Sequence, residues 1–558
     1  MKKVLLVLFC VVITSCNQGS KETVEKLRIW EPYDDAADVA VNADHDTKRI
    51  RYRLIQSKVL DKNDVFLPLY DAVSKMTEET YQALKPLILE QNIFVLQKSI
   101  KDGLLTYENL VLFYLYRIYK YELDNKTTLN TVLALNKNVL EEARALDLQI
   151  KNGTAPDFQH PIYGMPILLK DNINAKGMHT TAGSIALLDN EVEDAFIVKR
   201  LKENGALILG KVNLSEWAYF LCSGCPVGYS AVGGQTMNPY GRGLFETGGS
   251  SSGSGTSVAA NYAVAAVGTE TSGSILSPSS QNSVVGLKPT IGLLSRSGIV
   301  PISSTLDTPG PMTKNITDNA ILLSALMGYD AADDKSVNNQ FSGILSAPLH
   351  PTDFREMRLG AFTTLLESDS IYKATVAQMR SLGVQIIEFT PPEVSMDGFR
   401  SILNIDMKND LPAYLEANTN SEKVNIKNIA DAVTFNAADS VIRIPYGQAL
   451  FHGILADSTS EEGLKEIKSR LETSGRSFFD AVMDAHNLDA VLSINNYHAG
   501  YAAVAKYPAL TVPMGYKNSG EPISLTFIAK QFKEAELLRL GAAYEKVFQK
   551  RKMPVGYE

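Results

Sequence analysis

Apolar residues recur at helical spacing in the first third of the chain. Residues 93–122 carry apolar positions three and four residues apart, with a break at Gly103, and so predict two amphipathic helices. Residues 129–148 keep the same spacing and predict a third helix. The Leu and Tyr residues of these helices are expected to pack into a core.

Beyond a Gly/Pro loop at residues 152–161 the apolar runs shorten to strand length. Runs at 167–169 and 207–209 flank a helical pattern at 195–204, and further strands are predicted at 357–362, 384–390, 488–495 and 507–516. Residues 395–480 are mainly helical in pattern, and a closing helix is predicted at 534–550. Strands that alternate with helices predict an α/β sheet.

Residues 247–290 contain two clusters of glycine and serine, at 248–255 and 268–274, around the small apolar segment 258–267. This order predicts a loop, a buried element and a second loop. A flexible linker is the alternative, but linkers carry no such Val-Ala run. Glycine lets the backbone approach a ligand closely, so serines among these glycines are well placed for nucleophilic chemistry.

A serine nucleophile needs a base, and Lys170 is the candidate. It follows the apolar run 167–169, which places it at the end of a buried strand. Burial there would lower the pKa of the amine and make its neutral form accessible. The alternative is an ordinary surface or ion-paired lysine.

Four motifs in this order resemble the amidase signature family: GMPILLKD at 164–171, GGSSSGS at 248–254, GTETSGSI at 268–275 and GLKPT at 286–290. The resemblance covers residues 90–555, and NLSEWA at 213–218 looks most like the peptide amidase branch. It implies the amidase signature fold, a large mixed β-sheet covered on both faces by helices, and hydrolysis of a carboxamide through an acyl-enzyme without a cofactor.

The same resemblance assigns the site residues. It implies Ser274 as the nucleophile, Ser250 as a bridging serine held through a cis peptide bond, and Lys170 as the terminal base. The oxyanion hole would be formed by the backbone N–H groups of Thr271, Ser272, Gly273 and Ser274. The family usually has glycine at the position of Ser272 and often aspartate at that of Glu270, a departure that leaves backbone donors in place.

Other interpretations of the chemistry remain. Residues 249–253 satisfy the G-x-S-x-G pattern of an α/β-hydrolase, with Ser251 as nucleophile, although the preceding residues do not resemble a buried strand. Its base would be one of three histidines: His452, His486 or His498. A binding protein that captures a ligand without turnover is a second alternative. The amidase-like component of a cytoplasmic glutamyl-tRNA amidotransferase is a third, which an export signal disfavours.

The N-terminus resembles a lipoprotein signal. Lys2 and Lys3 precede an apolar run at 4–13, which is too short to span a bilayer. The run closes on Ile-Thr-Ser-Cys, similar to a bacterial lipobox, with Cys16 as the lipidated residue; an ordinary secretory signal is the alternative. We therefore expect a signal peptide at 1–15, a tether and helical extension at 16–90, and an amidase domain at 91–556, anchored to a membrane of the bacterial envelope through Cys16.

The composition limits the classes of partner that we expect for this protein. The 558 residues are 45% hydrophobic and 21% charged, with a formal net charge of −8. This composition is typical of a globular protein. The negative net charge argues against the basic surface that a nucleic-acid-binding protein needs. We expect a small-molecule or peptide amide substrate and no nucleic acid, and the oligomeric state stays open.

Two further features leave alternatives open. Cys222 and Cys225 can form a small disulfide or remain free structural thiols, since a zinc site would need two more ligands. In the 395–480 region, apolar residues at helical spacing form either a pocket wall or a face packed on its own core. These residues are Tyr446, Leu450, Phe451 and Ile454.

Overall fold

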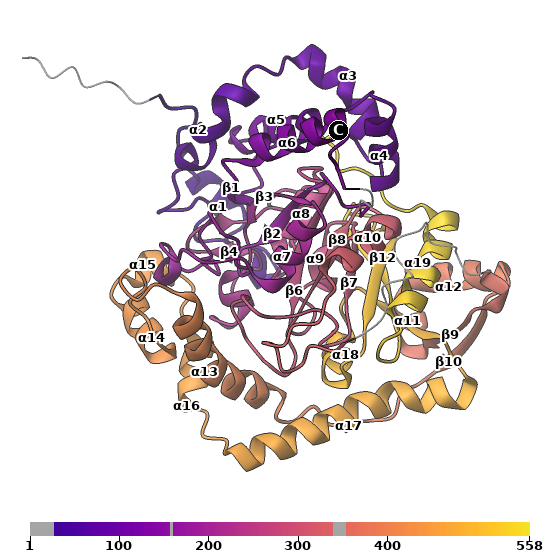
Figure 1. Ribbon diagram of the computed structural model, residues 1–558. Coiled ribbons are helices and arrows are strands. Elements are labelled where there is room, and N and C mark those ends of the chain that lie inside the picture. The colour runs from indigo at the N-terminus through magenta and orange to yellow at the C-terminus, as the bar shows by residue number, and fades with distance from the viewer. Residues whose placement is uncertain (1–26, 157–159, 339–352) are drawn as a thin grey trace, which may run out of the picture.

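The computed structural model describes residues 27–156, 160–338 and 353–558 (Figure 1). The expected signal peptide and Cys16 lie outside these residues. Within the described residues one mixed sheet of eleven strands forms the centre of the molecule, and a short β-ribbon lies beside it.

The strand order across the sheet is β1-β3-β2-β6-β8-β7-β12-β13-β11-β9-β10. Strands β3, β2 and β6 run parallel, as do β11, β9 and β10, and the pairs between these two groups are antiparallel. The strands are β1 (Val132–Leu135), β2 (Pro166–Lys170), β3 (Leu207–Val212), β6 (Ala265–Glu270), β7 (Val285–Lys288), β8 (Thr308–Thr313), β9 (Arg358–Phe362), β10 (Gln385–Phe389), β11 (Ala490–Ile494), β12 (Ala509–Tyr516) and β13 (Pro522–Ile528), and the ribbon is β4 (Tyr229–Ser230) with β5 (Gly234–Gln235).

Helices cover both faces of the sheet, as neighbouring residues of β12 show. The side chain of Leu510 faces Gly541 of α19, whereas the Thr511 hydroxyl bonds Ser280 of α9. Successive side chains of a strand point to opposite faces, so α9 and α19 lie on opposite sides of the sheet. This confirms the expected α/β class.

The helices are α1 (Ala36–Val41), α2 (Lys62–Val73), α3 (Glu78–Ile88), α4 (Ile93–Lys101), α5 (Tyr107–Glu122), α6 (Val139–Asn152), α7 (Phe196–Glu203), α8 (Ser252–Ala259), α9 (Leu276–Gln281), α10 (Ile316–Leu326), α11 (Thr363–Ser368), α12 (Ser370–Ser381), α13 (Phe399–Asn418), α14 (Ile429–Ala437), α15 (Ser440–Arg443), α16 (Ala449–Ala456), α17 (Glu461–His486), α18 (Ala499–Ala505) and α19 (Glu534–Phe548). The two helices predicted at 93–122 are confirmed as α4 and α5, and the closing helix as α19.

The single helix predicted at 129–148 is wrong. Residues 132–135 form strand β1, which pairs antiparallel with β3, and only the following residues form helix α6. A short apolar run such as Val-Leu-Ala-Leu fits either period, so the free edge of β3 decides its conformation.

The segment expected to be a solvated tether packs against the body of the protein from residue 27 onward. The Asp35 carboxylate accepts the N–H groups of Ile55 (3.1 Å) and Gln56 (3.0 Å), and Asn63 accepts the N–H group of Ile29 at 2.8 Å. Gln235 in β5 in turn donates its backbone N–H to the Ile55 carbonyl at 2.8 Å. The extension is therefore part of the fold.

Helices α13 to α16 form a lobe at the lower left in Figure 1, and their apolar residues form a second hydrophobic core together with residues of the main body such as Trp217 and Leu306. Phe451 and Ile454 are buried in that core, and the Tyr446 hydroxyl accepts the backbone N–H of Arg53 at 2.7 Å. The apolar spacing in α16 thus reflects packing into this shared core rather than a pocket wall. Helix α17 runs along the lower side of the molecule.

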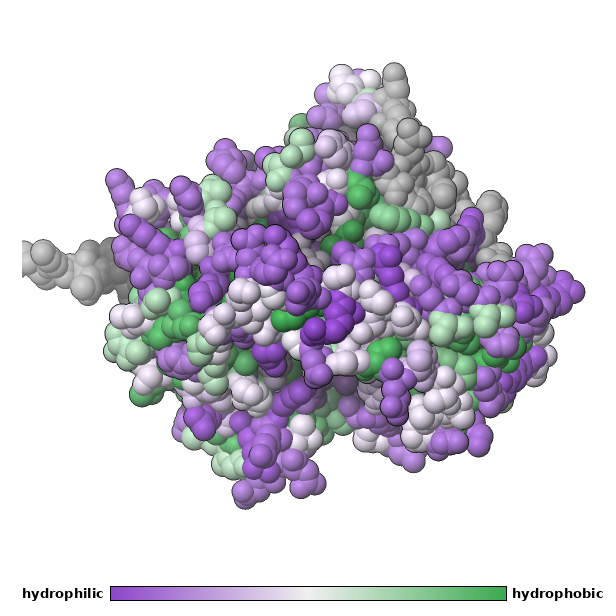
Figure 2. Space-filling model, turned by 90° about the horizontal axis from the view of Figure 1, so that it is seen from below, coloured by the Kyte–Doolittle hydropathy of each residue, from purple (hydrophilic) through white to green (hydrophobic). Residues whose placement is uncertain are grey.

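The lower face is mixed in character. Figure 2 shows hydrophilic residues there, with small hydrophobic patches scattered among them. Among the described helices, none is long and apolar enough to cross a membrane.

Replacing Asp35 by alanine tests whether the extension is an integral part of the fold. It leaves the N–H groups of Ile55 and Gln56, two buried residues, without their acceptor, which costs about 1–3 kcal/mol per unsatisfied group. We expect faster limited proteolysis within residues 27–60 and a lower urea midpoint. Asp44→Ala, at an exposed position of the same extension, serves as control; equal behaviour of the two variants would contradict the docking.

Candidate active site

Lys170 ends strand β2 and is fully buried. Its Nζ lies 2.7 Å from Ser250 Oγ, 2.8 Å from Thr269 Oγ1 and 3.1 Å from the Thr269 carbonyl oxygen. The structure thus brings two of the expected site residues into direct contact, and it adds Thr269, which the sequence did not single out.

Burial controls the charge of Lys170. Loss of solvation lowers the pKa of its amine from 10.5 to about 7, and the carboxylates of Asp307 and Glu270 oppose this only in part. The next residue, Asp171, does not neutralise the effect because its carboxylate pairs with the buried Lys211 at 3.0 Å. Lys170 can therefore be an uncharged base near neutral pH.

The segment that carries Ser250 enters helix α8 through a cis peptide bond between Gly249 and Ser250, as the resemblance implied. Gly248 precedes it with a φ of +63°, and a Cβ atom there would lie 2.6 Å from the Ser277 carbonyl oxygen. Only glycine fits this close approach of two chain segments. Ser250 itself is fully buried.

Ser274 lies beside this segment. Its carbonyl oxygen accepts the N–H of Ser251 at 3.1 Å, and its side chain is partly exposed. No described residue forms a hydrogen bond to the Ser274 hydroxyl, so this hydroxyl is free to meet a substrate.

Glu270 organises the loop that contains Ser274. Its carboxylate accepts the N–H groups of Gly273 (2.6 Å), Ile275 (2.7 Å) and Leu276 (3.0 Å). This is a correction to the expected oxyanion hole, because the Gly273 N–H already has an acceptor. The N–H groups of Thr271, Ser272 and Ser274 have no protein acceptor among the described residues.

The alternative nucleophile, Ser251, occupies a structural position. Its buried hydroxyl donates to the Thr269 carbonyl at 3.0 Å and accepts the Thr269 N–H at 3.2 Å. The histidine His498 bonds Ser493 at 2.7 Å and stacks on Phe362. The geometry of an α/β-hydrolase elbow is therefore not formed at Ser251.

Two further side chains support the site. Asn172 donates to Thr269 Oγ1 at 2.9 Å, and Asp307 accepts a hydrogen bond from the Thr271 hydroxyl. Asp307 also accepts the N–H groups of Ile302 and Ser303, which fixes the turn before it. The position of Asn172 two residues after Lys170 is the one sequence signal that could have pointed to it.

The family model described as Amidase matches residues 109–493. The chain belongs to the amidase family.

Similar proteins include a probable amidase of Arabidopsis thaliana, 35% identical, covering 84% of this chain and 92% of the relative. Among solved structures, an amidase family protein from Bacillus anthracis superposes with a TM-score of 0.83 at 34% identity, covering 90% of this chain and 99% of that one. The native peptide amidase from Stenotrophomonas maltophilia gives 0.78 at 35% identity, covering 84% and 98%. The fold is therefore the amidase signature fold, and membership supports amide hydrolysis.

In this member of the amidase family a cavity of about 440 Å³ reaches the candidate site at Asn172, Thr269 and Thr271. From the lobe it is lined by residues of α13, among them Asp410 and Tyr414. The lobe thus forms one wall of the cavity through α13, whereas α16 packs away from it. Among the described residues no group of three or more His, Cys, Asp or Glu side chains could hold a metal ion.

The charge of Lys170 predicts a pH dependence for any reaction in which it accepts a proton. Below its pKa of about 7 the amine is protonated and cannot act as a base, and above that pH it is neutral. We expect kcat/KM for an amide to rise through about pH 7 and then level off. Lys170→Ala should lower the rate by roughly 10²–10⁴-fold and abolish this rise. A rate that is highest below pH 5 would contradict a lysine base.

Proposed function

We propose that this protein hydrolyses a carboxamide to a carboxylate and ammonia or an amine by a Ser-Ser-Lys mechanism. Neutral Lys170 accepts a proton from Ser250 while Ser250 takes the proton of Ser274, whose oxygen attacks the carbonyl carbon. Loss of the protonated amine leaves an ester on Ser274. Water then cleaves this acyl-enzyme through the same groups in reverse.

The contact between Lys170 Nζ and Ser250 Oγ, at 2.7 Å in a buried site, is the observation that carries this proposal. A serine bonded to a lysine of lowered pKa can relay a proton, which an isolated serine cannot. Ser274, whose hydroxyl has no partner among the described residues, lies on the adjoining segment. The Ser251 N–H donates to the Ser274 carbonyl and so joins the two segments.

We assign the oxyanion hole to the backbone N–H groups of Thr271, Ser272 and Ser274. The Gly273 N–H contributes indirectly, because its bond to Glu270 holds the loop in place. Donors fixed before the reaction stabilise the developing negative charge without a cost of reorganisation.

For the substrate we favour the C-terminal amide of a peptide. The solved structures similar to this chain include a peptide amidase at 35% identity, and the 440 Å³ cavity is large enough for more than a small aliphatic amide. Long-chain acyl amides are the second candidate, and binding without turnover is the third.

Substitution of the two candidate serines tests the mechanism. Ser274→Ala should abolish turnover with the fold intact, because it removes the attacking oxygen. Ser251→Ala removes only buried hydrogen bonds, and we expect it to retain activity with about 1–3 kcal/mol less stability. The assay measures release of ammonia or amine from peptide C-terminal amides, aliphatic amides and N-acyl amides.

The same panel decides among the alternatives. Turnover of peptide amides alone supports a peptide amide as the substrate. Turnover of long-chain acyl amides would instead identify those amides as the substrate. A wild-type activity that survives Ser274→Ala but is lost in Ser251→Ala would establish the elbow nucleophile. Ligand binding without turnover of any amide would identify a binding protein.

We further propose that the protein is anchored to a membrane of the bacterial envelope through lipid on Cys16. Support comes from the signal-like residues 1–15 and from a disulfide between Cys222 and Cys225, which suits an oxidising compartment outside the cytoplasm. Both observations favour a mature chain that works beyond the cytoplasm.

Metabolic labelling with palmitate tests the anchor. Label should follow the wild-type chain into the membrane fraction and be absent from Cys16→Ser, because the thiol is the site of attachment. Cys10→Ser, which leaves Cys16 in place, should lower the labelling little. A mature chain that begins elsewhere and stays in the soluble fraction would refute the anchor.

A further inference from the structure

Ser215 connects the backbone of Ser250 to the loop of residues 215–228, which lies outside the site described above. Its N–H donates to the Ser250 carbonyl at 3.0 Å, and its Oγ accepts the N–H of Gly228 at 2.8 Å. A Cβ atom on Gly249 would lie 2.6 Å from Ser215 Oγ, so Ser215 packs directly on the peptide that precedes Ser250. The position of Ser250 therefore depends on where Ser215 is held.

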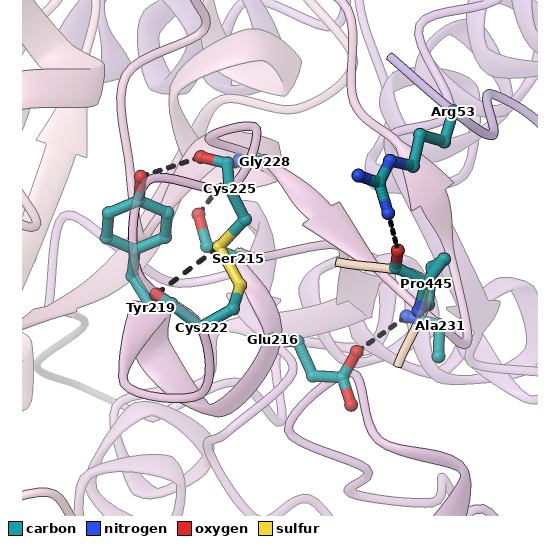
Figure 3. The surroundings of a disulfide bond; sticks show 9 residues. All are labelled: Arg53, Ser215, Glu216, Tyr219, Cys222, Cys225, Gly228, Ala231 and Pro445. Carbon is teal, nitrogen blue, oxygen red and sulfur yellow. Dashed lines mark hydrogen bonds between the residues drawn. A yellow bond between two sulfur atoms is a disulfide. The ribbon is translucent and has the colours of Figure 1, made fainter. Parts of the chain in front are cut away.

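The loop of residues 215–228 is cross-linked near its middle. Cys222 and Cys225 form a disulfide, and the Tyr219 hydroxyl donates to the Cys225 carbonyl at 2.7 Å (Figure 3). Figure 3 also shows the hydrogen bond from Gly228 to Ser215 that closes the loop on itself. The disulfide thus lies within a loop whose two ends are joined by the bond between Gly228 and Ser215.

This loop has an unfavourable backbone. Trp217, Ala218 and Tyr219 have φ values of 50°, 53° and 73°, which side-chain-bearing residues rarely adopt. Such conformations cost on the order of 1–3 kcal/mol each and persist only where surrounding contacts impose them. The disulfide and the Tyr219 bond are the contacts that close the loop just after these three residues.

The other side of the loop contacts the lobe that lines the cavity. The Leu221 carbonyl accepts the N–H of Leu450 at 3.1 Å, and the rings of Trp217 and Phe451 lie 5.5 Å apart. The loop therefore bridges the lobe and the backbone of Ser250.

We propose that Ser215 is a positioning residue for Ser250, and that the Cys222–Cys225 disulfide keeps it in place, so that reduction of the disulfide slows attack by Ser274. This inference rests on the proposed function. A displaced Ser250 carbonyl moves its hydroxyl relative to Lys170 Nζ, and a shift of about 1 Å in a proton relay can cost a hundredfold in rate.

Reduction of the Cys222–Cys225 disulfide needs only a dithiol. A dithiol reductant attacks one sulfur, forms a mixed disulfide and then closes its own disulfide, so that two electrons and two protons pass to the protein as two thiols. Cys222 is partly exposed and the tip of the loop at Ser223 and Gly224 is exposed, which admits the reductant. Reoxidation by a small-molecule disulfide reverses the step.

The test measures the rate at which a fluorophosphonate labels Ser274, with and without dithiothreitol, in the full-length chain. We expect dithiothreitol to lower the labelling rate constant and kcat of the wild type by about ten- to a hundredfold. The final labelling stoichiometry should be unchanged and the thermal midpoint should stay above the assay temperature, so the loss is not unfolding. Oxidised glutathione should restore the rate.

Three variants sharpen the result. The double variant Cys222→Ala, Cys225→Ala keeps Cys10 and Cys16. Its labelling rate should equal that of the reduced wild type and should not change with dithiothreitol. Ser215→Ala should label slowly even with the disulfide intact, at full stoichiometry. Ser223→Ala, at the exposed tip of the loop, should behave as the wild type.

Other outcomes overturn the inference. If mass spectrometry shows both thiols free while the wild-type rate is unchanged, the disulfide does not position Ser250. A fall in stoichiometry parallel to the fall in activity would show that reduction only unfolds the chain. Absence of wild-type labelling, or labelling that persists in Ser274→Ala, would instead overturn the proposed function on which the inference stands.

Discussion

The contact between a buried, readily uncharged lysine and a buried serine is the constraint on which this site depends. Among the described residues Lys170 has no carboxylate in direct contact, because Asp171 is directed to Lys211, and burial lowers its pKa to about 7. An ion pair in its place would keep the amine charged. The surrounding sheet therefore excludes water from the end of β2, as the proposed role of Lys170 as a base requires.

Backbone groups complete the site, and their placement explains the density of glycine and serine. The segment before Ser250 passes so close to Ser277 that Gly248 cannot carry a side chain. Glu270 then accepts three backbone N–H groups around Ser274. One carboxylate therefore orders the backbone of this loop, while the buried side chains of Ile275 and Leu276 anchor its end.

Several elements could not be predicted from the sequence, and each case has a physical reason. Pro309 and Pro311 favour a loop, yet residues 308–313 form β8 because β6 and β7 supply a partner on each side. Residues 27–46 lack a hydrophobic period and suggest a tether, but Asp35 and Asn63 accept backbone N–H groups that hold this segment against residues 55–63. The Ile55 carbonyl in turn accepts the N–H of Gln235 in the body. In both cases the deciding partner lies far away along the chain.

The sequence by itself determined the α/β class, many of the helices and strands, and the family, and it supplied Lys170, Ser250 and Ser274 as the candidate site residues, because local periodicity and four compact motifs carry that information. Tertiary structure alone decided that Thr269 and Asn172 support the lysine, that the Gly273 N–H is already bonded to Glu270, and that Ser215 ties Ser250 to a disulfide loop. Except for the Gly273–Glu270 bond, which is local but depends on how the loop folds back on Glu270, these contacts join segments that are well separated in the sequence, and no local pattern encodes their distances.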